Sequence, residues 1–300
     1  MTLPDMTLQN FLIGALIALL SFIFLRMCYW FYQGRKLQLS GYMPPSSTRF
    51  ARWFYKMACH LITFLGVGPV KVIGTENAEF VGRGLILPNH QFALDFAVVG
   101  KSTPFSFRQV AKAKEVKNPI LGTLAAWIGT VGVQVEGGKS QGGGGQAVID
   151  AGAKILAKSS GARMLLFPQG KLVFDNKLVV DDFRTGATRI LNTTVAMVGN
   201  EGLFVLPMAV HYKRDRKDAT RFHRFMNAIG FKGFRRWKDF ELVVNADGSK
   251  TKVDRIYTTY GATVAIGKPM AVKDLSTDPR VAINTVAAEI QKLLTQAENG

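Results

Sequence analysis

An uninterrupted apolar run dominates the start of the chain. Residues 11–25 contain no charged side chain, and after a single arginine the apolar pattern continues to position 32. About 22 such residues suffice for a helix that crosses a hydrocarbon core of about 30 Å. The aromatic cluster Tyr29–Tyr32, followed by Arg35 and Lys36, is typical of a cytoplasmic membrane interface. We therefore expect a retained anchor with the rest of the chain in the cytoplasm. A cleaved signal peptide is the alternative, although the leader contains Asp5 and no basic residue.

A second N-terminal helix is predicted over residues 48–65, after a Pro-rich stretch. Its large apolar side chains fall on one stripe at helical spacing and its basic side chains on a second. The two stripes are Phe50, Trp53, Phe54, Met57, Leu61 and Phe64, and Arg49, Arg52, Lys56 and His60. This pattern favours a helix lying in the plane of the lipid headgroups, and a core-facing helix of a soluble domain is the alternative. Residues 1–67 are thus expected to form two membrane-anchoring helices.

From residue 68 to residue 300, short runs rich in Val, Ile and Phe alternate with helical patterns. Interleaved strands and helices predict an α/β domain with a mixed, largely parallel sheet flanked by helices. The last helix is the clearest, with Thr277 expected as its cap and Pro279 in its first turn. The predicted strands are Val70–Ile73, Gly84–Leu87, Phe105–Val110, Val131–Val135, Met164–Phe167, Phe204–Val210, Phe240–Val244 and Thr263–Ile266, and the predicted helices are Asp95–Val99, Pro119–Ile128, Gln146–Lys158, Thr185–Leu191 and Arg280–Gln296.

Composition and charge narrow the class of protein. Apolar residues make up 48% of the 300 residues and charged residues 20%, which excludes disorder, a collagen-like chain and a disulfide scaffold. Cys28 and Cys59 lie in the apolar helices without metal-ligand spacing, so neither a metal site nor a disulfide is expected. The net charge of +17 and the basic, aromatic tract 211–238 call for an anionic partner. Beside an anchor, an anionic membrane surface is the simplest one; a polyanionic substrate and a solvated loop are alternatives, and nucleic acid is not expected.

Candidate chemistry first occurs where the second predicted strand ends, at His90, with Asp95 in an apolar stretch five residues later. On one regular helix the two side chains would point about 140° apart. If they touch, His90 must lie in the loop and Asp95 in the first helical turn. Asp95 would then fix the imidazole tautomer and leave the other ring nitrogen as a base. The alternative is a capping turn followed by a buried aspartate with no role in chemistry.

A second strand end carries the turn Pro168-Gln169-Gly170-Lys171 after the predicted strand Met164–Phe167. Such a turn can direct backbone N–H groups at a developing oxyanion. Further along, Phe183-Arg184-Thr185-Gly186 opens a predicted helix beside the same polar region. The two strand ends together therefore define one candidate site.

These motifs, in this order, resemble the glycerolipid acyltransferase family from about Val70 to Pro269. His90 and Asp95 fit its NHx4D motif with Asn89 in place, and Lys112 to Gly122 fits its second block. Phe167-Pro168-Gln169-Gly170 takes the place of its Phe-Pro-Glu-Gly-Thr-Arg block. The remaining matches to the family are the stretch from Phe183, the strand around Pro207, and Gly267-Lys268-Pro269.

The resemblance implies that residues 68–300 transfer a fatty acyl group from acyl-CoA or acyl carrier protein to a lysolipid hydroxyl at the cytoplasmic face of a membrane. His90 would deprotonate the hydroxyl, Asp95 would orient His90, and no metal or bound cofactor would be needed because a thioester is already activated. Acyl chain length would be set by a tunnel lined from residues 119–128. The substrate-binding residues implied by the motifs are Asn89, Lys112, Lys114, Phe167, Pro168, Gln169, Gly170, Lys171, Arg184 and Gly186.

The third block departs from the family pattern. Gln169 stands where the family has Glu, and Lys171-Leu172 where it has Thr-Arg. The loss of the Arg removes a bidentate grip on phosphate that Lys171 replaces only as a point charge. The acceptor is therefore either a lysophospholipid, such as lysophosphatidic acid, or an amino-acid lipid or glycolipid precursor, with Arg184, Arg189 and Lys177 as alternative cations. A catalytically idle lipid-binding protein with the same fold is the rival of a different class.

Overall fold

The computed structural model describes most of the chain, and the site lies within the described part. The described residues are 8–39, 48–79, 82–112, 119–133, 144–173, 176, 178–218, 236–244 and 249–300. Of the residues singled out above, Lys114, Lys177 and residues 219–235 of the basic tract lie outside the described residues. Their functions stay predictions.

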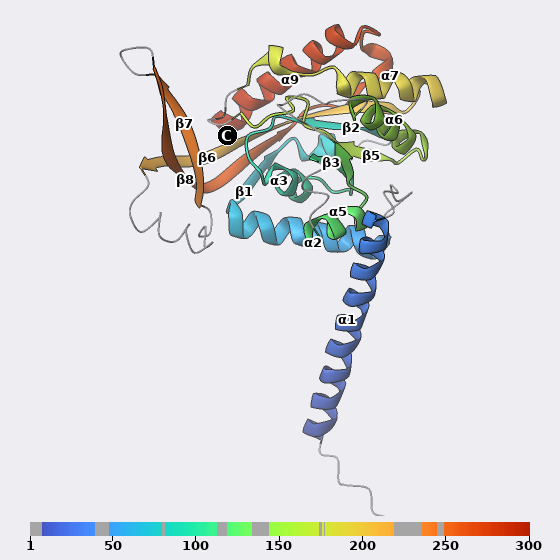
Figure 1. The fold of residues 1–300 in the computed structure, drawn as a ribbon. Helices are drawn as coiled ribbons and strands as arrows, with labels where there is room; N and C mark the ends of the chain where they lie inside the picture. Colours follow the sequence, from blue (N-terminus) through green and yellow to red (C-terminus); the bar gives the residue numbers. More distant parts are fainter. Residues whose placement is uncertain are drawn as a thin grey trace, which may run out of the picture.

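The first helix, α1 (Leu8–Leu39), projects from the rest of the molecule (Figure 1). Its stretch Asn10–Lys36 contains an 18-residue window with a mean hydropathy of 2.4 and no buried residue, so the helix is long and apolar enough to cross a membrane. The end of α1 packs closely on α5 (Leu121–Trp127), where a Cβ at Gly34 would lie 2.5 Å from the Thr123 carbonyl oxygen. The close approach needs glycine at this position.

The second helix, α2 (Arg49–Gly66), begins at Thr48, whose hydroxyl caps the Ala51 N–H at 3.1 Å. One face of α2, with Tyr55 and Cys59, is buried against α3 (Asp95–Ser102), while the large apolar side chains of Trp53, Met57, Leu61 and Phe64 are exposed. The exposed stripe is part of the one predicted from the sequence. Lys56 departs from the predicted basic stripe, because its ammonium turns inward and donates to the Gly100 and Thr103 carbonyls at the end of α3.

The strands form a single mixed sheet. Along its main path the strands run β1-β8-β6-β2-β5-β3-β4, and every pairing is parallel except the antiparallel β6–β8 pair. This confirms the predicted α/β fold with a largely parallel sheet. The strands are β1 (Val70–Ile73), β2 (Arg83–Pro88), β3 (Arg108–Lys112), β4 (Val131–Val133), β5 (Arg163–Leu165), β6 (Leu203–Asp218), β7 (Arg236–Val244), β8 (Lys250–Ile266) and β9 (Met270–Ala271).

Strands β6 and β8 are much longer than the sequence pattern predicts. They extend beyond the helices as an antiparallel arm, which β7 joins by pairing with β8 (Figure 1). The first part of the basic tract, up to Asp218, therefore belongs to a strand. The backbone of this part pairs with β8 in the same sheet. This pairing joins residues distant in sequence, so the local hydropathy pattern does not reveal it.

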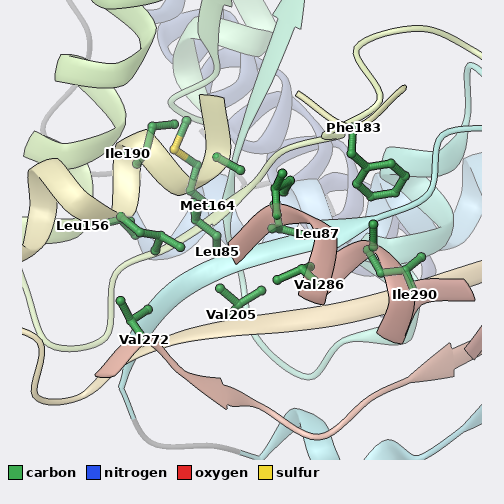
Figure 2. Packing of buried hydrophobic residues seen from close by; sticks show 14 of the residues in the cluster. Leu85, Leu87, Leu156, Met164, Phe183, Ile190, Val205, Val272, Val286 and Ile290 are labelled. Carbon is green, nitrogen blue, oxygen red and sulfur yellow. The ribbon is translucent and has the colours of Figure 1, made fainter. Parts of the chain in front are cut away.

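Helices cover both faces of the sheet, and a hydrophobic core lies under each. Leu85 and Leu87 of β2 face a cluster built with α6 (Gly144–Ala157), α7 (Gly186–Val198) and α9 (Pro279–Asn299), as Figure 2 shows. Ile86, between them, faces the cluster under α2 and α3. This alternation is expected of a strand buried on both faces. It fixes the register of β2, and so the direction in which the residues after it leave the sheet.

The cap of the last helix differs from the sequence expectation. Asp278, not Thr277, is the N-cap of α9, and its carboxylate accepts from the N–H groups of Arg280 and Val281 at 2.7 and 3.0 Å. Asp and Thr are both good caps, and Asp278 is the one directly before Pro279 at the first helical position. These backbone hydrogen bonds lower the pKa of the Asp278 carboxyl.

Candidate active site

The candidate site forms where adjacent parallel strands end. Strands β2 and β5 pair in parallel, so the segments that follow Pro88 and Leu165 leave the sheet at the same edge. Ligands of open α/β sheets collect at this carboxyl edge. Asn89, directly after β2, is fully buried, and its amide exchanges two hydrogen bonds with the Val210 backbone, at 3.1 and 2.8 Å. Asn89 thus extends the β2–β6 ladder by one side chain and fixes the position of His90.

His90 and Asp95 meet as the sequence geometry required. His90 lies in the loop, Asp95 is the first residue of α3, and His90 Nδ1 lies 2.9 Å from Asp95 Oδ2. Asp95 is completely buried, whereas the side chain of His90 is 22% exposed. A carboxylate can only accept, so Nδ1 carries the proton and Nε2 presents its lone pair. No hydrogen bond to Nε2 is found within the described part of the chain.

Asp95 is held by four donors. Besides His90, its Oδ2 accepts from the N–H groups of Gln91 and Phe92 at 2.6 and 2.9 Å. Its Oδ1 accepts a short hydrogen bond from the hydroxyl of Tyr212, which is fully buried in β6. A buried carboxylate without such partners would be strongly destabilising. The four bonds therefore explain how an acid is tolerated in an apolar stretch, and they fix its orientation.

The segment that follows β5 contacts both the ring and the backbone of His90. The Phe167 ring stacks on the imidazole, with centroids 4.1 Å apart and an interplanar angle of 20°. Gln169 Oε1 accepts the His90 N–H at 2.7 Å, and the Val173 N–H donates to the His90 carbonyl at 2.8 Å. Gln169 is 1% exposed, and its Nε2 is a buried donor without a hydrogen-bond partner among the described residues.

The other residues of the third block, Pro168, Gly170 and Lys171, have no contact with the His90 side chain among the interactions described for this segment. Pro168 is buried, and its carbonyl accepts from the Arg184 N–H at 2.9 Å. Gly170 has φ of +65°, and a Cβ there would lie 3.0 Å from Nε of Arg184, whose side chain is exposed. Lys171 forms an ion pair with Asp182 at 2.8 Å, and both groups are partly solvated. The Arg184 guanidinium therefore lies against the turn at Gly170, while the ammonium of Lys171 is paired with Asp182.

Other residues predicted for the site fall around it. Gly186 is the first residue of α7 and half-buried, and Lys112 is the last residue of β3. Substrate binding by these residues stays a prediction, as it does for Lys114. Among the residues that the structure describes, no group of three or more His, Cys, Asp or Glu side chains could hold a metal ion.

Sequence reasoning missed Tyr212, Asn176 and Arg214. Asn176, in the left-handed region at φ of 54°, exchanges two hydrogen bonds of 2.9 Å with the Tyr212 backbone. This repeats, two residues along β6, what Asn89 does at Val210. The Arg214 guanidinium lies over the rings of Phe92 and Tyr212, at 4.7 and 4.2 Å from their centroids. Tyr212 and Arg214 follow the Pro207 strand motif by a few residues, and only the extension of β6 brings them to Asp95.

An apolar cavity of about 490 Å³ lies at the junction of α1, α2 and α5. Leu124 and Trp127, from the stretch predicted to line an acyl tunnel, form part of its wall. Trp127 also stacks on Trp30 of α1 with centroids 5.8 Å apart. The other lining residues are Phe24, Met27, Cys28, Phe31, Tyr32, Arg35, Phe50 and Phe54.

The structure thus has an α/β sheet with a histidine–aspartate pair at its carboxyl edge, and this fold and site can be compared with those of known proteins. Residues 69–211 match the family model described as Acyltransferase, a stretch that includes both strand ends of the site. This match confirms the resemblance to an acyltransferase family that the motifs of the chain carry. No curated protein sequence matches the chain.

A solved structure shares the fold. It is the crystal structure of the 1-acyl-sn-glycerophosphate (LPA) acyltransferase, PlsC, from Thermotoga maritima, which is 16% identical to this chain with a TM-score of 0.52. The alignment covers 96% of this chain and 98% of that one. At this identity the likeness establishes the fold and not the substrate.

Proposed function

We propose that the protein transfers a fatty acyl group from a thioester, acyl-CoA or acyl carrier protein, to the hydroxyl of a lysolipid. The observation that carries this proposal is the His90–Asp95 contact of 2.9 Å at the carboxyl edge of the sheet. It gives a partly exposed imidazole whose Nε2 carries a lone pair, held in one tautomer by a buried carboxylate. The match to the acyltransferase family model and the PlsC-like fold support acyl transfer as the reaction.

The reaction is a direct displacement. His90 Nε2 takes the proton of the lipid hydroxyl as its oxygen attacks the thioester carbonyl carbon, and Asp95 stabilises the imidazolium that forms. When the tetrahedral intermediate collapses, the C–S bond breaks and the proton on His90 passes to the leaving thiolate. General-base assistance of this kind contributes about 10²–10⁴-fold to the rate. The chain supplies the base and its orientation, and the thioester supplies the activation.

For the acceptor, we propose a lysophospholipid with an anionic headgroup. Arg184 lies exposed against the turn at Gly170, close in sequence to Gln169, which contacts the His90 backbone. Gln169 Nε2 offers an unpaired donor from a buried side chain. The neutral donor of Gln169 and the nearby cation of Arg184 can together bind an anionic headgroup, although this chain lacks the Glu and the Arg of the family block. An amino-acid lipid or glycolipid acceptor is the alternative that the assay below distinguishes.

The membrane is the proposed source of the acceptor. The apolar α1 and the exposed stripe Trp53, Met57, Leu61 and Phe64 of α2 support membrane association. The apolar cavity at the α1–α2–α5 junction supports a site for an acyl chain beside that membrane. Arg35 and Lys36, near the C-terminal end of α1, favour a cytoplasmic domain.

The test is acceptor-dependent thioester cleavage by the purified full chain in lipid vesicles. Free thiol is followed with acyl-CoA or acyl carrier protein as donor and with lysophosphatidic acid, other lysophospholipids, an amino-acid lipid or a glycolipid precursor as acceptor. The proposal expects thiol release only when an anionic lysophospholipid is present, together with a product that has gained the acyl mass. Failure of every donor and acceptor pair, with lipid binding intact, would identify an idle lipid-binding protein instead.

A further inference from the structure

Tyr212 is fully buried, and it bonds directly to the carboxylate that contacts His90. Its hydroxyl donates to Asp95 Oδ1, while Oδ2 of the same carboxylate contacts His90. The two oxygens of Asp95 thus face two different side chains, one from β6 and one from the loop after β2. A rotation of the carboxylate about its Cβ–Cγ bond would break both contacts at once.

The ring of Tyr212 is fixed from several directions. It packs edge-on against Phe92, with centroids 5.5 Å apart, and Arg214 lies over it. Asn176 holds its backbone N–H and carbonyl. The side chain is fully buried, and burial together with Asp95 raises the pKa of its phenol well above the ordinary value of 10.0. The hydroxyl therefore stays protonated and can act only as a donor toward Asp95.

We propose that Tyr212 is a positioning residue for the His90–Asp95 pair: by holding Oδ1, it sets the plane in which Oδ2 accepts the Nδ1 proton of His90. This inference rests on the proposed acyl transfer for its kinetic readout. Arg214 and Asn176 act one step further out, because each of them contacts Tyr212.

The first test is Tyr212→Phe, which removes one oxygen and keeps the ring packing. We expect kcat to fall about tenfold, because a hydrogen bond to a charged group is lost, while KM for donor and acceptor stays unchanged. Tyr55→Phe is the matched control, since Tyr55 is also buried and its hydroxyl donates to Gln109 at 3.1 Å, away from the pair. It should keep the wild-type kcat. Equal kcat values for Y212F and wild type would overturn the inference.

A double-mutant cycle tests whether Tyr212 acts through Asp95. In an Asp95→Asn background, Tyr212→Phe should change kcat less than twofold, because the carboxylate that it positions is gone. An equal fold-loss in both backgrounds would show that Tyr212 acts by another route and contradict the inference.

A spectroscopic readout separates this inference from the proposed function. In ¹⁵N-histidine-labelled wild type, His90 should show a protonated Nδ1 with a downfield proton, and this signal should broaden or vanish in Y212F but not in Y55F. If wild type shows the signal without acyl transfer, positioning holds and the proposed function fails. If acyl transfer is present and the signal is the same in Y212F, positioning fails. Should Y212F not fold, the Tyr212 hydroxyl proton of wild type is observed directly, and its absence from the downfield region overturns the inference.

Discussion

The His90–Asp95 pair and the neighbouring segment 168–184 show two ways of building one site. Around the pair, four donors converge on Asp95, and His90 is held through its ring and both of its backbone polar groups. In the segment, by contrast, Gln169 Nε2 is a buried donor without a partner among the described residues, and the Arg184 side chain is exposed. The difference teaches that the catalytic pair is fixed by a rigid network, whereas we assign recognition of the acceptor to one buried amide donor and one exposed guanidinium.

The largest effect on the His90–Asp95 pair is expected from the substitution Asp95→Asn. The amide would preserve the size of the side chain but remove the charge that stabilises the imidazolium and fixes its tautomer. We expect kcat to fall by about 10²–10³-fold, with KM changed little. Steady-state thiol release measures this, and Asp278→Asn, at the cap of α9, is the control that should keep activity. A loss confined to KM would mean that Asp95 serves binding instead.

The segment 168–184 is tested by introducing the residues that the family has at positions 169 and 172. Gln169→Glu should reduce kcat/KM for an anionic lysophospholipid by about tenfold, because the new carboxylate repels the headgroup in a partly desolvated site. Adding Leu172→Arg should recover most of this loss through a bidentate phosphate contact. The measurement is the ratio of kcat/KM for anionic and neutral acceptors. An unchanged ratio in Q169E would show that Gln169 does not face the headgroup.

A smaller effect is expected from the cation of the same segment. Arg184→Gln should raise KM for an anionic acceptor several-fold and leave kcat intact, because Arg184 lies against Gly170 and not against His90. Lys171→Gln is the comparison, since Lys171 is already paired with Asp182. If K171Q raises KM more than R184Q does, the anionic group binds on the Lys171 side.

The smallest predicted effect concerns stability at high pH. Burial raises the pKa of Tyr212 and of Tyr55 above 10.0. Each phenol therefore contributes stability that is fully present below pH 10 and is lost as the pH rises, at up to about 1.4 kcal/mol per pH unit. Denaturant unfolding of wild type, Y212F and Y55F between pH 9 and pH 11 should show a shallower decline in each variant. Identical slopes would contradict the closed environment assigned to Tyr212.

The sequence predicted what depends on local pattern. The short apolar runs at Gly84–Leu87 and Met164–Phe167 located the two strand ends. The spacing of His90 and Asp95 required a loop followed by a first helical turn if the two side chains touch, as found. Family resemblance added the third block. These features need only the residues within one element.

What the sequence did not reveal depends on pairing between distant residues. Tyr212 reaches Asp95 across 117 positions, and only the β2–β6 pairing brings them together. Residues 211–218 were interpreted as part of a basic tract. Their strand partner, β8, lies about 40 residues further along the chain, so the local pattern does not reveal that they form a strand. Lys56 was expected at the headgroups, but the carbonyls at the end of α3 attract its ammonium instead.

The most direct test of the account is acyl transfer by His90→Ala in the same vesicles as wild type, at equal concentration of folded protein. Removing the base should lower kcat by at least about 10²-fold while leaving vesicle binding and the unfolding transition close to wild type. A variant that still transfers acyl groups within about threefold of the wild-type rate would contradict a proton taken by His90, and with it the proposed mechanism.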